Sequence, residues 1–165
     1  MLIREIKFDD AENLVKLIKL VEIESQYMLF EPGERNTGPE QQRKRIEVMK
    51  EEGSSTIFVA EENNELVGYL IAMGGNAKRN KHSVYLVIGI LSEYRGLGLG
   101  EKLFKQLQVW AMEHDIHRLE LSVVNRNEAA LKLYKKMGFD IEGTKRDSLY
   151  IDGEFVDEYY MSKLL

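Results

Sequence analysis

The sequence predicts a single domain of the α/β (α+β) class, in which helices flank a sheet whose hairpins make it mostly antiparallel. Three patterns predict it. Apolar runs with strand character alternate with segments whose apolar residues recur at helical spacing. Asn63-Asn64 and Asp152-Gly153 are hairpin turn signals that join neighbouring strands in antiparallel fashion. The buried run Val87–Leu91 leads through a glycine-rich turn into a helix, and a chain of 165 residues with 44% hydrophobic residues can bury one core around such a strand.

The chain begins with a predicted strand and helix. Residues Leu2–Phe8 alternate between apolar and polar side chains, which is typical of a half-buried strand. Asp9 or Asp10 can cap the helix that follows, because a carboxylate accepts the free amide hydrogens of a first helical turn. The apolar face of this helix consists of Leu14, Leu17, Ile18 and Val21.

A loop and a second helix come next. Ser25–Gly38 contains a proline and glycines, which favour irregular structure. Pro39 suits the first turn of a helix that runs to about Glu52, because a proline there removes no intrahelical hydrogen bond. Ile46 and Met49 are expected to face inward.

The other elements follow from the same criteria, with a basic loop over Gly74–Lys81. Strands are predicted over Thr56–Glu61, Leu66–Met73, Arg118–Val124, Phe139–Tyr150 and Phe155–Leu164, and a helix over Glu128–Met137.

The turn Arg95–Gly100, between the buried strand and its helix, predicts an anion site. Glycines let a ligand approach the backbone, and the first amides of a helix have no partner inside it. A phosphate or pyrophosphate is the expected ligand. The glycine spacing differs from the dinucleotide pattern G-x-G-x-x-G, and Gly100-Glu101-Lys102 lacks the Ser or Thr that ends a P-loop.

Two motifs in this order resemble those of the GNAT acetyltransferase superfamily. Arg95-x-x-Gly98-x-Gly100 resembles its R/Q-x-x-G-x-G/A signature, whose loop holds the pyrophosphate of coenzyme A. A downstream segment resembles V-x-x-x-N-x-x-A-x-x-L-Y-x-x-x-G-F, with Val123, Asn127, Ala130, Leu133, Tyr134, Gly138 and Phe139 in its positions. The resemblance implies one N-acetyltransferase domain over residues 1–165, with a mixed, mostly antiparallel sheet that splays open after the central strand.

The resemblance also implies a site for acetyl-CoA as cosubstrate. The backbone N–H of Ile90 is expected to stabilise the oxyanion, Ile90 and Leu91 to pair with the pantetheine arm, and Tyr134 to protonate the leaving thiolate. Gly89 suggests a bulge or a close backbone approach in this strand, and the alternative is a crowded packing position. The implied cofactor-binding residues are Ile90, Leu91, Arg95, Gly96, Leu97, Gly98, Leu99, Gly100, Glu101, Asn127 and Tyr134.

The chemistry constrains Tyr134. A phenol titrates about 1.5 pH units above a thiol, so full proton transfer to the thiolate is uphill by about 2 kcal/mol. Either Lys135 or Lys136 lowers the pKa of Tyr134, or Tyr134 acts as a hydrogen-bond donor more than a full acid.

The sequence does not identify the general base or the acceptor. No carboxylate lies between Ser83 and Leu91, where some GNAT members place a glutamate. The candidates are Glu22, Glu24, Glu31, Asp147, Asp152 and His82. The resemblance implies transfer of acetyl directly to a primary amine in a ternary complex, the amine being a small molecule, a polyamine or a protein amino terminus, with Ser25–Gly38 in the acceptor cleft. The alternative is a non-catalytic acyl-CoA-binding or sensor domain.

Composition excludes several classes of function. The chain has no cysteine, which excludes disulfides and a cysteine nucleophile, and its three histidines have no metal-ligand spacing, so no metal is expected. A net charge of -5 disfavours nucleic acid as a partner. No apolar run could span a bilayer, and Met1–Glu5 does not resemble a signal peptide, so we expect a cytoplasmic protein with no membrane partner. The sequence leaves open whether the protein forms a homodimer.

Overall fold

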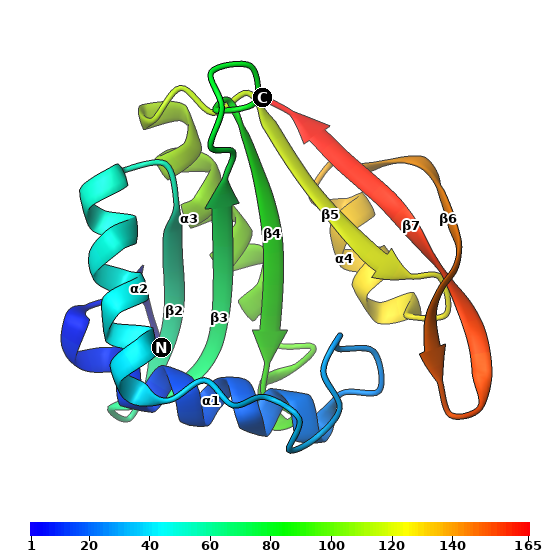
Figure 1. The fold of residues 1–165 in the computed structure, drawn as a ribbon, viewed down its shortest axis with the longest axis horizontal. Helices are drawn as coiled ribbons and strands as arrows, with labels where there is room; N and C mark the ends of the chain where they lie inside the picture. The colour runs from blue at the N-terminus through cyan, green and yellow to red at the C-terminus, as the bar shows by residue number, and fades with distance from the viewer.

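The computed structural model describes residues 1–165. Its seven strands are β1 (Leu2–Glu5), β2 (Thr56–Glu62), β3 (Glu65–Gly74), β4 (Ser83–Ile90), β5 (Arg118–Val124), β6 (Asp140–Ile151) and β7 (Glu154–Leu164). Its four α-helices are α1 (Ala11–Glu24), α2 (Pro39–Glu52), α3 (Leu99–Glu113) and α4 (Glu128–Lys136). The strands form one sheet in the order β1-β2-β3-β4-β5-β7-β6, in which only the β4–β5 pair is parallel (Figure 1). This is the mixed, mostly antiparallel sheet that the sequence predicts.

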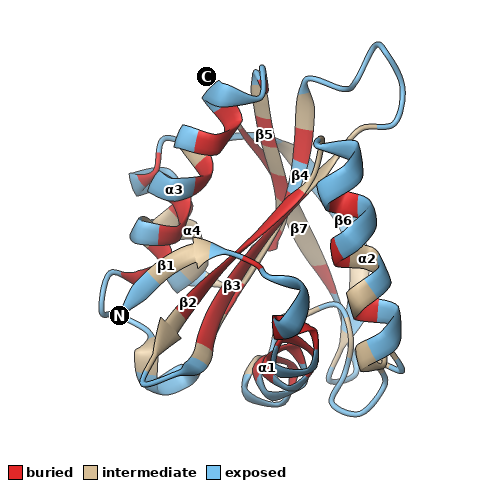
Figure 2. Cartoon of the chain, turned by 90° about the vertical axis from the view of Figure 1, so that its left-hand side faces the viewer, coloured by how far each residue is buried: buried red, intermediate tan, exposed pale blue.

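Helices cover both faces of the sheet. Helices α1 and α2 pack on one face, the α1–α2 face, and helices α3 and α4 on the other, the α3–α4 face (Figures 1 and 2). Successive residues of a strand alternate between faces, so Ile71 of β3 joins the core under α1 while Leu70 joins the core under α3. The predicted inward positions of α1 and α2 are buried, among them Leu14 and Ile46. Both helices therefore form because an apolar stripe meets the sheet.

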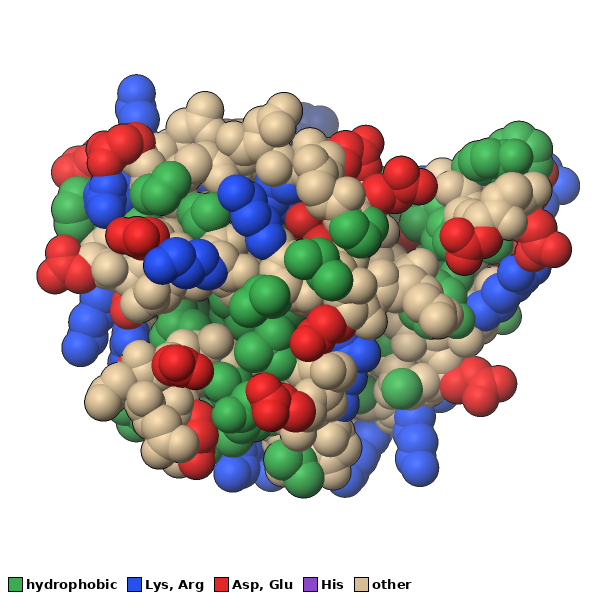
Figure 3. All heavy atoms as spheres, turned by 90° about the horizontal axis from the view of Figure 1, so that it is seen from below, with side chains coloured by type: hydrophobic (Ala, Val, Ile, Leu, Met, Phe, Trp, Pro, Cys, Tyr) green, Lys and Arg blue, Asp and Glu red, His purple; other side chains and the backbone are tan.

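The sheet opens between β4 and β5. Ser83–Tyr85 of β4 pair with Arg118–Glu120 of β5, and beyond this point β4 stays paired only with β3 while β5 stays paired with β7. The β6–β7 hairpin projects on the far side of the opening, as the view from below shows (Figure 3). The predicted splay after the central strand is confirmed.

The first strand is shorter than the prediction. The first strand ends at Glu5 and is followed by a short 3₁₀ helix, η1 (Phe8–Asp10). The carboxylate of Asp10 accepts the Lys7 N–H at 2.7 Å and pairs with Arg4 at 2.7 and 2.9 Å, which turns the chain out of the strand. Asp10 therefore does not cap α1 with its side chain, contrary to one of the two predicted caps.

The predicted hairpin turns are confirmed. Asn63 and Asn64 have φ values of 50° and 64°, and Asp152 and Gly153 have values of 49° and 79°. Positive φ at both central residues is the requirement of a type I′ turn, which matches the twist of the strands it joins.

The bulge suggested at Gly89 is wrong. The register between β3 and β4 runs unbroken from Gly68 opposite Ile90 to Gly74 opposite Val84. Gly89 is instead a crowded packing position, because a β-carbon at Gly89 would lie 2.6 Å from the ring of Tyr69. Gly89 is thus required by packing against a side chain of the neighbouring strand.

Candidate active site

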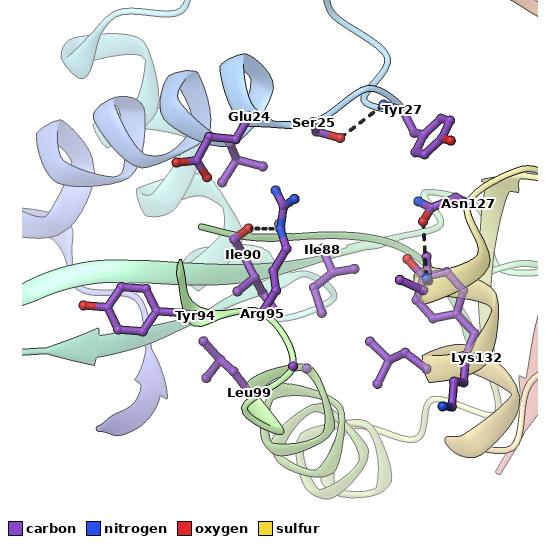
Figure 4. A pocket seen from close by; sticks show the side chains of 18 of the residues that line it. Glu24, Ser25, Tyr27, Ile88, Ile90, Tyr94, Arg95, Leu99, Asn127 and Lys132 are labelled. Atoms are coloured by element: carbon purple, nitrogen blue, oxygen red, sulfur yellow. Dashed lines mark hydrogen bonds between the residues drawn. The ribbon is translucent and has the colours of Figure 1, made fainter. Parts of the chain in front are cut away.

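A cleft of about 750 Å³ lies where β4 and β5 part (Figure 4). One wall is the end of β4 at Ile88–Ile90. The α3–α4 side consists of helix α4 and the residues Tyr94–Gly96 and Gly98–Glu101. The end of α1 and the loop residues Ser25–Met28 close it on the α1–α2 side. The cleft therefore connects both faces of the sheet at the splay.

The backbone of β4 is free along this cleft. The N–H of Leu91 donates to the Val67 carbonyl at 3.0 Å, and hydrogen bonding in an antiparallel ladder alternates along the strand. The N–H groups of Ile88 and Ile90 are therefore directed away from β3 and into the opening. Two unpaired amides on one strand edge can bind an extended chain or a developing negative charge.

Leu91 does not have the free backbone that we expected of it. Its N–H is bound to Val67, and its carbonyl accepts the Tyr94 N–H at 2.9 Å. Its side chain does not line the cleft. Ile88, two residues before Ile90, faces the opening in place of Leu91, because only every second residue of a strand has its N–H on that edge.

The glycine turn has the geometry of an anion cradle. Gly96 and Gly98 have positive φ values of 75° and 77°, and Gly98 is the N-cap of α3. The next amides, Leu99–Glu101, belong to the first turn of α3, where amides have no intrahelical partner and the helix dipole favours an anion. Lys132 of α4 also lines this part of the cleft and adds a positive charge that sequence reasoning missed.

Gly100 has a different role from Gly98. A β-carbon at Gly100 would lie 2.6 Å from Cδ2 of Leu133 on α4. This contact, together with the 2.5 Å ion pair between Lys136 and Glu101, holds the start of α3 against α4. The two predicted motifs are therefore packed on each other, which neither motif reveals alone.

Arg95 supports the end of β4. Its Nε donates to the Ile90 carbonyl at 2.9 Å, and its guanidinium extends across the cleft toward Glu24 and Ser25 (Figure 4). Leu97, in contrast, is 64% exposed and does not line the cleft. The other predicted residues line it: Ile90, Arg95, Gly96, Gly98, Leu99, Gly100, Glu101, Asn127 and Tyr134.

Tyr134 is a buried phenol at the wall of the cleft. Its ring contacts Phe104 edge-on at 5.8 Å between centroids and lies 6.1 Å from Phe139. Burial raises the pKa of Tyr134 above its ordinary value, and Tyr85 raises this pKa further. The expectation of a pKa lowered by Lys135 or Lys136 is therefore wrong, which leaves a neutral hydroxyl that can donate a hydrogen bond.

Asn127 caps α4. Its Oδ1 accepts the Ala130 N–H at 3.3 Å, and the residue lines the cleft opposite Tyr27 (Figure 4). The cap and a contact with a ligand are compatible, because the amide Nδ2 is not used in the cap.

Of the candidate bases, only Glu24 lines the cleft. Its carboxylate accepts the Ser92 N–H at 2.6 Å and so joins α1 to the residues after β4. Glu22 is buried and bound to Arg35, and His82 precedes the opposite end of β4. Glu31, Asp147 and Asp152 lie outside the cleft.

No group of three or more His, Cys, Asp or Glu side chains is arranged to hold a metal ion. His114, one of the three histidines, binds the Trp110 carbonyl at 2.8 Å at the end of α3. None of the helices is both long and apolar enough to cross a membrane.

The comparison with protein families agrees with this geometry. The model described as "Acetyltransferase (GNAT) family" matches residues 19–139, which contain both motifs and the splayed strands. The chain belongs to the GNAT acetyltransferase family. The fold of this GNAT protein closely matches that of a GNAT-family acetyltransferase from Streptococcus pneumoniae, with a TM-score of 0.95 and 32% identity over 99% of this chain and 98% of that one.

Two further relatives of this GNAT protein are informative. L-amino acid N-acetyltransferase AaaT of Escherichia coli (strain K12) is 32% identical over 106 residues, which are 62% of this chain and 64% of the relative. The match thus spans less than two thirds of that relative's length. The structure of yncA from Salmonella typhimurium, solved with its cofactor acetyl-CoA, has a TM-score of 0.87 over 99% of this chain and 93% of that one. Its identity is 18%, so this likeness concerns the fold alone.

Proposed function

We propose that this GNAT protein is an acetyl-CoA-dependent N-acetyltransferase that moves an acetyl group directly to a primary amine in a ternary complex. One observation carries the proposal: the cleft at the β4–β5 splay brings together an anion cradle, two free strand amides and a buried phenol. These three features match the diphosphate, the amide-containing arm and the thioester of acetyl-CoA in turn.

Each end of acetyl-CoA has a group to bind it. The amides after Gly98 and the ammonium of Lys132 bind the pyrophosphate, because that end of the cleft combines a helix N-terminus with a positive side chain. The free edge of β4 at Ile88 and Ile90 pairs with the pantetheine arm as an added strand would. The binding residues of the proposal are Ile88, Ile90, Arg95, Gly96, Gly98, Leu99, Gly100, Glu101, Asn127, Lys132 and Tyr134.

The acetyl transfer follows from this placement. The neutral amine attacks the thioester carbon, and the charge that develops on its oxygen is stabilised by the Ile90 N–H. The carbon–sulfur bond then breaks, and the hydroxyl of Tyr134 donates a hydrogen bond to the departing sulfur. Because burial raises the pKa of Tyr134, full transfer of its proton costs more than the ~2 kcal/mol expected for an ordinary phenol. The thiolate therefore takes its proton from water. A water molecule also accepts the proton that the amine loses after its attack.

The acceptor enters from the α1–α2 face. The cofactor motifs occupy the α3–α4 side of the cleft, so the remaining access to the thioester lies between α1, the loop Ser25–Met28 and the edge of β4. Glu24 at this entrance is the carboxylate that can accept the proton of the amine through a water molecule.

The test is release of free thiol from acetyl-CoA with a panel of amines: polyamines, amino acids and short peptides with free amino termini. We expect thiol release above the hydrolysis blank with at least one class. Calorimetric binding of coenzyme A without thiol release from any acceptor would instead indicate the alternative, a non-catalytic acyl-CoA-binding or sensor domain.

A further inference from the structure

Arg45 on α2 is a partly buried cation without an acidic partner. Two other arginines of this region pair with carboxylates, Arg43 with Glu40 and Arg35 with Glu22. The guanidinium of Arg45 instead contacts the thioether of Met73 at 3.3 Å, and sulfur is a weak acceptor. Burial lowers the pKa of Arg45, and the like charge of Arg35 lowers it further. The interior near Arg45 is therefore short of negative charge.

Gln42 adds a second unpaired donor. It lies one turn before Arg45 on the same side of α2, is only 2% exposed, and its Nε2 has no hydrogen-bond partner. A buried N–H group without a partner is unfavourable unless a ligand binds it. Arg45 and Gln42 together thus present hydrogen-bond donors that the protein itself does not use.

These donors lie beside the opening on the face where the acceptor enters. Met73 of β3 is the cross-strand partner of Tyr85, and Tyr85 belongs to the last residue pair before β5 leaves β4. Met73 packs against the α1–α2 core, so Arg45 is placed on the α1–α2 face, at the point where the splay begins. Gly89 is next to the proposed oxyanion donor. It lies four residues after Tyr85 on β4, which is about 13 Å along an extended strand.

The charges favour an anion at this place. Glu22 is 1% exposed and bound to Arg35 at 2.6 Å between Oε1 and Nε, so these two charges compensate each other. The positive charge of Arg45 is left uncompensated. A guanidinium binds a carboxylate through two parallel hydrogen bonds, whereas a polycationic acceptor would be repelled.

We propose that Arg45 and the side-chain amide of Gln42 bind a carboxylate of the acceptor, so that the acceptor is an amine that also carries a carboxylate several carbons away, an amino acid with a long chain between the two groups rather than a polyamine. This inference rests on the proposed N-acetyltransferase function, since it places the acceptor by the same cleft.

The test compares each amino acid with the amine that lacks its carboxylate. The pairs are glycine and methylamine, L-lysine and cadaverine, and 6-aminohexanoate and pentylamine, which also sample the distance from amine to carboxylate. In the Arg45→Met variant we expect the KM of the preferred amino acid to rise about tenfold to a hundredfold. The KM of its matched amine and the Kd of coenzyme A should stay within twofold.

Three variants accompany this measurement. Arg43→Met removes a neighbouring arginine of α2 that pairs with Glu40, and it should behave as the unmodified protein. Arg45→Lys keeps the positive charge but cannot form the two parallel hydrogen bonds of a guanidinium. It should raise the KM of the amino acid by a smaller factor than Arg45→Met. Gln42→Met removes an unpaired buried donor, so it should fold at least as well while still raising the KM of the amino acid.

Equal changes for an amino acid and its matched amine would overturn the proposal, and so would an unmodified protein that prefers cadaverine or pentylamine. If no amine releases thiol, the proposed function fails, and the carboxylate site is judged by calorimetry with 6-aminohexanoate and the coenzyme A complex. Binding that is lost in Arg45→Met supports the site, and absence of binding to the unmodified protein overturns it.

Discussion

The ring of Tyr69 lies against the bare α-carbon of Gly89, so close that a β-carbon there would stand 2.6 Å from Cε1 and Cζ and 2.7 Å from the hydroxyl oxygen. Tyr69 is 1% exposed and packs in the core under α1 and α2. Gly89 is flanked by Ile88 and Ile90, whose amides face the cleft. The packing of one buried tyrosine is thus tied to the strand edge on which the proposed chemistry depends.

Gly89→Ala should therefore destabilise the fold. The new methyl group overlaps a ring that has no room to move, and overpacking of this kind costs about 1–3 kcal/mol. Urea unfolding measures the loss. Gly143→Ala is the matched control, because nothing lies within 4 Å of its β-carbon position. The double variant Gly89→Ala, Tyr69→Leu should recover part of the stability, and an unchanged midpoint in Gly89→Ala alone would contradict the contact.

Gly98→Val should weaken binding of acetyl-CoA and coenzyme A equally. Gly98 has a φ of 77°, which costs a residue with a β-carbon about 1–2 kcal/mol, and the shifted backbone no longer presents its amides to the pyrophosphate. We expect at least a tenfold rise in Kd by calorimetry. Leu97→Ala, a change of an exposed side chain outside the cleft, should leave Kd unchanged. A folded Gly98→Val protein with normal affinity would refute the cradle.

Tyr134→Phe should lower kcat by about 10²–10³ with little change in the affinity for acetyl-CoA, because it removes a hydrogen-bond donor to the developing thiolate and keeps the ring. The pH dependence gives a second test. Burial raises the pKa of Tyr134, so its hydroxyl stays protonated beyond pH 10 and should cause no loss of kcat between pH 7 and about 10. A decline of kcat in this range that disappears in Tyr134→Phe would show that the phenol titrates normally.

Glu24→Ala should raise the KM of the acceptor about fivefold, because it removes both a carboxylate at the entrance and the hydrogen bond to the Ser92 N–H, a contribution of about 1 kcal/mol. Glu31→Ala and Asp152→Ala should leave acceptor kinetics unchanged, since both residues lie outside the cleft. Steady-state kinetics at saturating acetyl-CoA compare the three variants. An effect of Asp152→Ala as large as that of Glu24→Ala would place the acceptor on the β6–β7 hairpin.

The sequence alone determined the local elements and the order in which they occur. Hairpin turns, the apolar faces of α1 and α2 and the glycine turn before α3 depend on residues close together in the chain. Such features are set by backbone conformation and by the spacing of side chains, so a pattern can predict them. The two motifs were enough to indicate the family and the cofactor.

Only the tertiary structure decided which groups meet. Whether Leu91 or Ile88 has a free amide depends on the register with β3, and the pKa of Tyr134 depends on the burial of its ring rather than on the lysines beside it in sequence. The unpaired donors of Arg45 and Gln42 become visible only when the partners of every neighbouring charge are known. Ladder register, burial and charge compensation join residues that are distant in the chain, which is why no local pattern contains them.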